Sequence, residues 1–501
     1  MKLILTEDNK FLRISECTET EYDQIVLSLT RKIRGANFHP LVKKKLWDGK
    51  VKFINNRLIP VGLWDRVTKI CNQFGIELSI EGMERIINYD FEEAGVSKFS
   101  EEFFSDHPKY KPRDYQVKAA ALAIKYRLSQ SQIATSAGKT MISFLTYAYL
   151  KSIGVVKRML VIVPNTTLVM QLKDDWEEYN NGKIPMKIRQ VYGGAKDNDP
   201  EADVIVGTFQ SLSKKDINFF KDITVINIDE SHQTGVSSIK TVLSKCTDSI
   251  IRFGMTGTLK EDESADYLTV EALTGPNINS ISPKYLFQQG FATPVKFKII
   301  ALRYQDEDFR ESLYNTRRSR QLEGSEILAL EKKYIRASKK RFKIICDLVS
   351  KTSKNTLVLF SDIKDAYGTN MYNTVRETSD KNCFYIDGKT DQDKREHYKK
   401  QMEIGENKVM FASFNTFSTG VSIKNLHTIV FTESYKSEVI VKQSIGRGMR
   451  QIAGKDTFNV VDFVDDMSWN GKDNYLLAHG KDRLEFYKQY TDDITIHTIK
   501  I

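Results

Sequence analysis

The chain has 501 residues, of which 41% are hydrophobic and 28% are charged, and its formal net charge is +10. This composition excludes a disordered chain, and the length predicts two to four folded domains. No apolar run reaches the roughly 18–20 residues that span a bilayer, and the N-terminus lacks the apolar core of a signal peptide, so we expect no membrane partner. The five cysteines are scattered with no CxxC pair, which favours free thiols in a reducing cytosol over a zinc site or disulfides.

The excess positive charge is concentrated near the N-terminus. Residues 31–69 contain eleven Lys and Arg but only two Asp, a local charge of +9. A basic region of this size favours an anionic partner such as nucleic acid.

The first ninety residues alternate short strand and helix signals, which predicts a small α+β domain. KLILT (2–6) and FLRIS (11–15) are expected strands, and residues 21–33 are an expected helix capped by Thr18 or Thr20. Asp48-Gly49 predicts a hairpin, and a second turn at Asn55-Asn56 would extend it to a three-stranded meander. The apolar positions that follow recur at helical spacing, and GIELSI (75–80) is an expected closing strand. These positions are Leu63, Val67, Ile70 and Phe74.

In that hairpin, strand alternation would place lysines on one face of each strand and apolar residues on the other. Lys43 and Lys45 would face outwards from the first strand, and Lys50 and Lys52 from the second. We interpret this face as a platform for duplex phosphates; the alternative is a merely solvated face. Trp47 and Trp64 are expected to pack in the core, because aromatics at strand or helix spacing usually do.

Residues 90–106 have the acidic, glycine-containing composition of a linker. Beyond them, short apolar runs alternate with loops and helical patterns, which is typical of parallel strands covered on both faces. The first group of runs comprises residues 158–164, 203–208, 225–229 and 252–257. After a charged helical stretch (305–355), the second group comprises residues 355–362, 383–388, 408–413, 428–434 and 458–465. The expected domains are therefore 1–92, 93–290 and 291–501.

Two segments of the middle domain carry the chemistry of a nucleotide site. IATSAGKT (133–140) is a small-residue loop between a strand and a helix, where backbone N–H groups and the helix end attract phosphate. Lys139 would reach the β- and γ-phosphates, and the Thr140 hydroxyl would bind Mg²⁺. Asp229, at the end of a later strand, would hold the metal, and Glu230 would polarise the attacking water. Either segment alone also fits an ordinary loop or helix start, but together they favour an NTPase.

In the last domain, QSIGRGMR (443–450) brings Gln443, Arg447 and Arg450 onto one short segment. Arginine engages phosphoryl oxygens bidentately, so we interpret Arg447 and Arg450 as fingers that complete the nucleotide site, although surface charge is the usual role of arginine.

The ordered motifs across residues 110–465 resemble those of superfamily 2 helicases. RDYQ (113–116) resembles the adenine-reading motif, ATSAGKT motif I, and VPNTTLVMQ (163–171) motif Ia. VGTFQSL (206–212) resembles the next strand-gripping segment, and DESH (229–232) is similar to a DEAH-type motif II. TGT (256–258), LVLFSD (357–362), STGVSIKNL (418–426) and QSIGRGMR resemble motifs III to VI.

The resemblance implies two RecA-like parallel-sheet domains that bind ATP and Mg²⁺ between them. It assigns nucleotide contacts to Arg113, Gln116, Thr135, Ser136, Ala137, Gly138, Lys139, Thr140, Gly420 and Gln443. It assigns nucleic-acid grip to Thr166, Thr208 and Thr419. Coupling between the domains falls to His232, Thr256 and Thr258. Ser136 stands where the family usually has Gly, Ser231 where it has Ala, and Ser422 where an acid is common.

WDG (47–49), RLIPVGL (57–63), TSAGK and FSTGVSIKNLH (417–427) make the chain similar to the UvsW-type recombination helicases of tailed bacteriophages. That resemblance implies unwinding and branch migration of forks, Holliday junctions and displacement loops, and removal of RNA–DNA hybrids. It also implies a monomer working in the host bacterial cytosol. An RNA helicase, or a degenerate motor acting as a nucleic-acid-binding or annealing scaffold, remain the alternatives.

Overall fold

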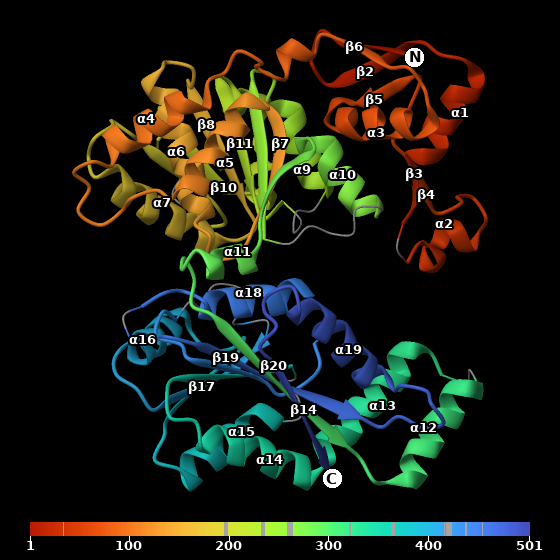
Figure 1. The fold of residues 1–501 in the computed structure, drawn as a ribbon, viewed down its shortest axis with the longest axis vertical. Coiled ribbons are helices and arrows are strands. Elements are labelled where there is room, and N and C mark those ends of the chain that lie inside the picture. Colours follow the sequence, from red (N-terminus) through yellow and green to blue (C-terminus); the bar gives the residue numbers. More distant parts are fainter. Residues whose placement is uncertain are drawn as a thin grey trace. The chain divides into compact units, whose positions relative to one another are not determined.

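The computed structural model describes residues 1–33, 35–194, 199–231, 236–257, 264–319, 322–361, 366–414, 416, 423–435, 438–452 and 454–501. The chain forms two compact units (Figure 1). The first comprises Met1–Ala134 and Gly138–Ile281, and the second comprises Thr135–Ala137 and Ser282–Ile501.

The N-terminal domain is built on a four-stranded sheet in the order β5-β2-β1-β6. The two predicted N-terminal strands are confirmed and pair antiparallel, whereas β6 joins β1 in parallel. Helix α1 (Glu19–Ser28) is capped by Thr18, whose side chain and that of Glu21 form a reciprocal capping box. The helix is shorter than predicted, because residues 30–32 leave it to form a strand. The strands are β1 (Lys2–Leu5), β2 (Phe11–Glu16), β5 (Leu58–Pro60) and β6 (Ser79–Glu81).

The predicted Asp48-Gly49 hairpin is wrong. Gly49 has a φ of +76°, but Asp48 does not adopt a positive φ, and residues 40–43 form the short helix α2 (Pro40–Lys43). Strand β4 (Lys50–Lys52) pairs instead with β3 (Thr30–Lys32), and seventeen residues separate the two strands. The two strands form an arm, residues 30–52, that carries η1 (Ala36–Phe38) and α2 away from the four-stranded sheet (Figure 1).

Two further local predictions are corrected. The second turn does form, but β5 pairs with β2 rather than with β4, so no meander exists; its positive-φ residues are Asn56 and Arg57. The expected linker contains helix α4 (Glu93–Phe103), which packs on helices of the middle domain. Trp64 lies against the core as predicted, whereas Trp47 packs edge-on against His39 within the arm.

The core of the N-terminal domain continues into the first RecA-like domain. Leu128, Tyr267 and Leu268 of the latter are buried in the same cluster as Leu3, Ile59 and Val67. A Cβ atom on Gly62 would lie 2.2 Å from the carbonyl oxygen of Glu271, so the two backbones meet closely. The helices that make this contact are η2 (Val61–Leu63), α3 (Trp64–Phe74) and α10 (Ala265–Thr274).

The first RecA-like domain contains a seven-stranded sheet in the order β13-β7-β12-β11-β8-β10-β9, parallel throughout. Its central strands are continuous apolar runs that are buried on both faces, as the sequence predicted. The strands are β7 (Leu128–Ile133), β8 (Arg158–Val163), β9 (Ile188–Val191), β10 (Val204–Thr208), β11 (Ile223–Asp229), β12 (Ile251–Thr256) and β13 (Asn277–Ile281). The remaining helices of this domain are α5 (Asp114–Lys125), α6 (Lys139–Ser152), α7 (Thr166–Asn180), α8 (Phe209–Leu212), η4 (Ile217–Phe220) and α9 (Val236–Lys245), and η3 (Met83–Arg85) belongs to the N-terminal domain.

The second unit contains another seven-stranded parallel sheet, in the order β16-β17-β15-β18-β19-β14-β20. Its strands are β14 (Val295–Arg303), β15 (Thr356–Phe360), β16 (Asn382–Ile386), β17 (Lys408–Ser413), β18 (Thr428–Phe431), β19 (Phe458–Asp466) and β20 (Ile494–Lys500). Its helices are α11 (Pro283–Gln288), α12 (Glu307–Ser319), α13 (Gly324–Ala337), α14 (Lys339–Ser350), α15 (Tyr367–Thr378), α16 (Gln392–Glu403), α18 (Glu438–Gly448) and α19 (Tyr475–Tyr487).

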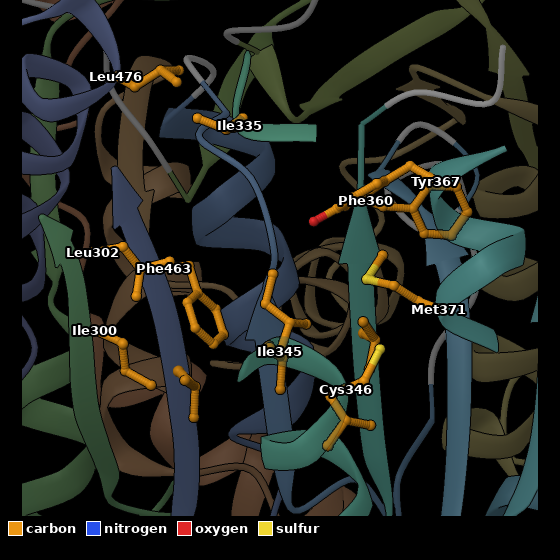
Figure 2. Packing of buried hydrophobic residues seen from close by; sticks show 14 of the residues in the cluster. Ile300, Leu302, Ile335, Ile345, Cys346, Phe360, Tyr367, Met371, Phe463 and Leu476 are labelled. Carbon is orange, nitrogen blue, oxygen red and sulfur yellow. The ribbon is translucent and has the colours of Figure 1, made fainter. Parts of the chain in front are cut away.

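Helices α13, α14 and α15 cover one face of this sheet. Figure 2 shows Ile300 and Phe463 of the strands near Ile345 of α14, and Phe360 beside Tyr367 of α15. The predicted fold class, two RecA-like parallel-sheet domains preceded by a small α+β domain, is confirmed, and the sheet of the small domain is mixed. No helix among the described residues is long and apolar enough to cross a membrane.

Candidate active site

The predicted phosphate loop connects β7 to α6, and its conformation depends on two positive φ angles. Gly138, which precedes the first turn of α6, has a φ of +81°, and Ser136 has a φ of +69°. A residue other than glycine is strained in this region, so Ser136 holds the loop at a conformational cost. The N-terminus of a fourteen-residue helix thus faces the loop, as a phosphate site requires.

Gln116 lies directly against this loop. Its side chain is 6% exposed, and its Oε1 accepts a hydrogen bond of 2.8 Å from the backbone N–H of Arg113. A Cβ atom on Gly138 would lie 2.3 Å from Nε2 of Gln116. The fold therefore brings the predicted adenine-reading residue and the phosphate loop together, although they are separated by more than twenty residues of sequence.

Lys139 and Glu230 form an ion pair in the same region. Nζ of Lys139 lies 2.7 Å from Oε1 of Glu230, and both side chains are 11% exposed. Glu230 follows β11 with a φ of +51°, and its backbone N–H donates to Oδ1 of Asp229 at 3.0 Å. A positive φ in a glutamate indicates a backbone held by its surroundings, and such outliers cluster at functional sites.

Burial controls the protonation of these groups. It raises the pKa of Asp229 to about 6, against the opposing attraction of Lys139, while the neighbouring Glu230 raises it further. Burial also opposes the charge of Lys139, but Glu230 and Asp229 together raise its pKa above the ordinary value. The site is a compact group of one cation and two acids, in which burial raises the pKa of Asp229 and the acids raise the pKa of Lys139; shifted pKa values of this kind are typical of catalytic sites.

Three threonines to which the sequence assigns nucleic-acid grip or coupling lie at the same edge of the sheet as the phosphate loop. Thr166 begins α7 after β8, Thr208 ends β10, and Thr256 ends β12. Because the strands are parallel, these positions and the loop after β7 share the carboxyl edge, where ligands bind in open α/β sheets. Thr208 and Thr256 are buried, and Oγ1 of Thr208 donates to Ser211 at 3.1 Å. His232, Thr258, Thr419 and Gly420 lie outside the described residues.

Gln443 and Arg447 lie on α18 of the second unit, four residues apart and therefore on one face of that helix. Arg450 follows the helix end. Lys455, 7% exposed, donates from Nζ to the carbonyl oxygens of Gly448 and Arg450, and Thr293 donates from Oγ1 to the latter at 3.2 Å. Sequence reasoning missed both residues, because no motif marks a lysine that folds back onto the preceding helix end, and Thr293 is 157 residues from Arg450 in the chain.

The four N-terminal lysines are all exposed, but the arm arranges them differently from the prediction. Lys50 and Lys52 share one face of β4, as expected, and their cross-strand neighbours on that face are Lys32 and Thr30. Lys43 ends α2, and Lys45 has a φ of +56° outside any strand.

Three family models of known proteins match three successive parts of the chain. Residues 5–81 match the family model of the N-terminal domain of the DNA helicase UvsW. Residues 109–261 match that of the res subunit of type III restriction enzymes, and residues 340–451 that of the helicase conserved C-terminal domain.

The chain is 29% identical over 508 residues to the ATP-dependent DNA helicase uvsW of Enterobacteria phage T4, covering 97% of each chain. The crystal structure of T4 UvsW aligns over 100% of this chain and 99% of that one, with 26% identity and a TM-score of 0.50. Dbp5 of S. cerevisiae, solved bound to RNA and ADP BeF3, shares the fold at 14% identity and a TM-score of 0.53, covering 80% of this chain and 92% of that one.

Two parallel-sheet domains of RecA type, with a phosphate loop and a paired lysine and glutamate at one sheet edge, define a helicase of superfamily 2. The similarity extends through the N-terminal domain to the whole length of T4 UvsW. The chain therefore belongs to the UvsW-type helicases.

Proposed function

We propose that this chain is an ATP-dependent DNA helicase that unwinds and branch-migrates forks, Holliday junctions, R-loops and D-loops in phage recombination, repair and replication. The observation that carries the proposal is the Lys139–Glu230 pair at a phosphate loop, in a chain similar to a phage DNA helicase along its whole length. The five cysteines are free, which supports work in the host cytosol, where we expect a monomer.

The first RecA-like domain supplies most of the nucleotide contacts in this proposal. Gln116 and Arg113 hold the adenine side of ATP, and residues 135–138 surround its phosphates with backbone N–H groups. Lys139 moves from Glu230 to the phosphoryl oxygens, which releases Glu230 to take a proton from the attacking water.

Mg²⁺ fits this donor set, because the ion is held by one or two protein oxygens together with the phosphates. Thr140 supplies a hydroxyl and Asp229 a buried carboxylate. The ion supplies charge stabilisation to the departing phosphoryl group. From the second domain, we assign phosphoryl contacts to Arg447 and Arg450 and supporting nucleotide contacts to Gln443 and Gly420.

Sequence-independent grip on a DNA strand falls to Thr166, Thr208 and Thr419 in this proposal, because hydroxyls and backbone N–H groups bind phosphate without reading bases. His232, Thr256 and Thr258 link that grip to hydrolysis. Because Thr208 is buried and its hydroxyl bonds Ser211, we assign its part of the grip to the backbone N–H groups of the loop that it holds, and buried Thr256 holds the loop after β12 in the same way.

The arm is the proposed duplex-binding element. Lys32 and Lys50 lie directly opposite each other, and like charges at such positions are destabilising unless an anion lies between them. Together with Lys52 they form a lysine face on β3 and β4, and Lys43 and Lys45 extend it at the arm's end. DNA phosphates, including those of RNA–DNA hybrids, supply the compensating charge.

Phosphate release with and without DNA tests the motor. We expect stimulation by DNA, unwinding of four-way junctions, forks and R-loops in preference to duplex RNA, and loss of turnover in Lys139→Ala with DNA binding retained. Preference for duplex RNA would instead support an RNA helicase. Absence of turnover in the wild type would support a nucleic-acid-binding scaffold, and retained turnover in Lys139→Ala would refute the site.

The arm is tested by substitutions at its surface, because removal of the whole domain would expose Leu128 and Leu268 of the shared core. We expect Lys32→Gln/Lys50→Gln/Lys52→Gln to weaken junction binding and to flatten its salt dependence by roughly three phosphate contacts. Lys2→Gln/Lys10→Gln/Lys69→Gln is the matched control, with the same charge change in the same domain outside the arm. If the salt dependence of junction binding has the same slope in both variants, the lysine face is only solvated and does not bind DNA.

A further inference from the structure

A second basic segment, residues 332–343, lies at the junction of α13 and α14. It contains seven Lys and Arg and no acidic residue among its twelve positions. The two arginines are largely buried in ion pairs, whereas the lysines are exposed except for the half-buried Lys332.

The arginines fasten the junction to the carboxyl ends of the strands. Nε of Arg336 donates to Glu433 at 2.7 Å, and its Nη2 donates at 3.2 Å to Ser361, which follows β15. Arg341 is fully buried, and Nε donates to Asp465 at 2.7 Å while Nη1 donates to the hydroxyl of Tyr367 at 2.7 Å. Buried, bidentate ion pairs of this kind hold the junction in one geometry, because the loss of one partner would leave the other charge buried and unpaired.

Two lysines of the same segment differ from these arginines in their exposure and in their pairing. Lys333 and Lys339 are both exposed, and neither has an ion pair with any carboxylate of the described residues. Several other lysines of the same domain do have acidic partners, for example Lys354 with Glu406 and Lys481 with Asp473. The charge of Lys333 and Lys339 is therefore uncompensated within the described structure.

These lysines line a groove of about 670 Å³ between the junction and α15. Its cations are Lys333, Arg336 and Lys339, its neutral polar groups include Asn370, Asn373 and Thr374, and its described lining contains no carboxylate. The volume lies in the range of roughly 300–1,000 Å³ that is common for ligand sites. Phe342, packed edge-on against Tyr367 at 5.8 Å, adds an aromatic surface to the lining of the groove.

The position of the groove suits an anionic polymer. Helices α14 and α15 both begin at the groove, and the N-terminal end of each carries partial positive charge. The groove also adjoins the carboxyl ends of β15 and β18, where ligands bind in open parallel sheets. A cationic groove with an aromatic surface in its lining is the arrangement that tracks a single strand without reading its sequence.

We propose that this groove binds the sugar-phosphate backbone of single-stranded DNA, with Lys333 and Lys339 on phosphates and Asn370 and Asn373 on neighbouring oxygens. The inference rests on the proposed helicase function, for which it identifies a strand contact in the second RecA-like domain that no sequence motif marks. The buried arginines position the groove, and the two lysines contact the strand.

The test is the salt dependence of binding of the full-length chain to a single-stranded oligonucleotide. Each lost phosphate contact lowers the slope of log affinity against log salt by about 0.7. We expect Lys333→Gln/Lys339→Gln to lower it by about 1.4 and to weaken binding roughly tenfold at 0.15 M salt. Lys333→Arg/Lys339→Arg should restore the wild-type slope, and hydrolysis without DNA should not change.

Lys394→Gln/Lys400→Gln, with two exposed lysines of α16 outside the groove, is the matched control. Equal slopes in the groove variant and this control would overturn the proposal. Phosphate release by the wild type, measured with and without DNA, separates this failure from that of the helicase function. If DNA stimulates phosphate release by the wild type but the groove variant keeps the wild-type salt slope, only the groove proposal is refuted. If DNA does not stimulate phosphate release but the groove variant has a lower slope, only the helicase function is refuted.

Discussion

Nζ of Lys139 lies 2.7 Å from Oε1 of Glu230. The cation expected to hold the ATP phosphates is thus neutralised by the carboxylate expected to activate water. In the proposed mechanism, ATP displaces Glu230 from Lys139, and the same exchange frees the carboxylate as a base. The pairing would then couple nucleotide binding to preparation for hydrolysis.

The first prediction follows from that exchange. Glu230→Gln should bind ATP more tightly than the wild type, because Lys139 no longer has to leave an anionic partner, and should hydrolyse it at least about 100-fold more slowly. Isothermal titration with ATP and a phosphate-release assay measure the two effects. Weaker ATP binding in this variant would contradict the competition.

The second prediction concerns pH. Burial raises the pKa of Asp229 to about 6, so its carboxylate is ionised above that pH and protonated below it. Protonation removes the charge that would hold Mg²⁺, so kcat/KM for ATP should fall as the pH drops through about 6. Asp203→Asn, in the same domain but outside the site, should keep this inflection, and a profile that is flat from pH 5 to 7 would contradict the assignment.

The third prediction concerns the junction of the N-terminal and first RecA-like domains. Nε of Arg66 lies 2.8 Å from Oε2 of Glu271, which is 4% exposed. Arg66→Met leaves Glu271 buried without its partner, which should lower the free energy of unfolding by about 3–5 kcal/mol. Arg66→Met/Glu271→Met should recover most of the loss.

Lys69→Met, one turn further along α3, is the control for that substitution. Lys69 pairs with Asp65 but its side chain is 75% exposed, so its loss should cost less than about 1 kcal/mol. Urea denaturation compares the three variants, and equal losses for Arg66→Met and Lys69→Met would show that burial is not what gives the Arg66 pair its strength.

The fourth prediction concerns Lys455. Burial and the nearby charge of Arg450 lower its pKa to about 7, below the value of an unfolded lysine. Between pH 7 and 10 the unfolded chain binds this proton more than the folded chain does, so the stability that depends on Lys455 should rise with pH. The difference in free energy of unfolding between wild type and Lys455→Met should grow in favour of the wild type over this range, and a constant difference would contradict the shifted pKa.

Local chemistry predicted much of this protein. The continuous apolar runs, the capped start of α1 and the loop before Lys139 depend on neighbouring residues, and each formed as expected. The arm was mispredicted for a related reason: Asp48-Gly49 is a strong local turn signal, but the partner of β4 is set by Thr30–Lys32, which no short-range pattern identifies.

The sequence by itself determined the chemical groups of the candidate site and the parallel-sheet character of both large domains, because buried strands need unbroken apolar runs and a phosphate loop needs small residues before a helix. Only the tertiary structure decided which of these groups meet. The contact of Gln116 with Gly138, the fusion of the N-terminal core with α10, and the pairing of Arg336 and Arg341 with Glu433 and Asp465 all depend on residues far apart in the chain. Such contacts depend on which surfaces can pack and which charges can be paired once the whole chain has folded.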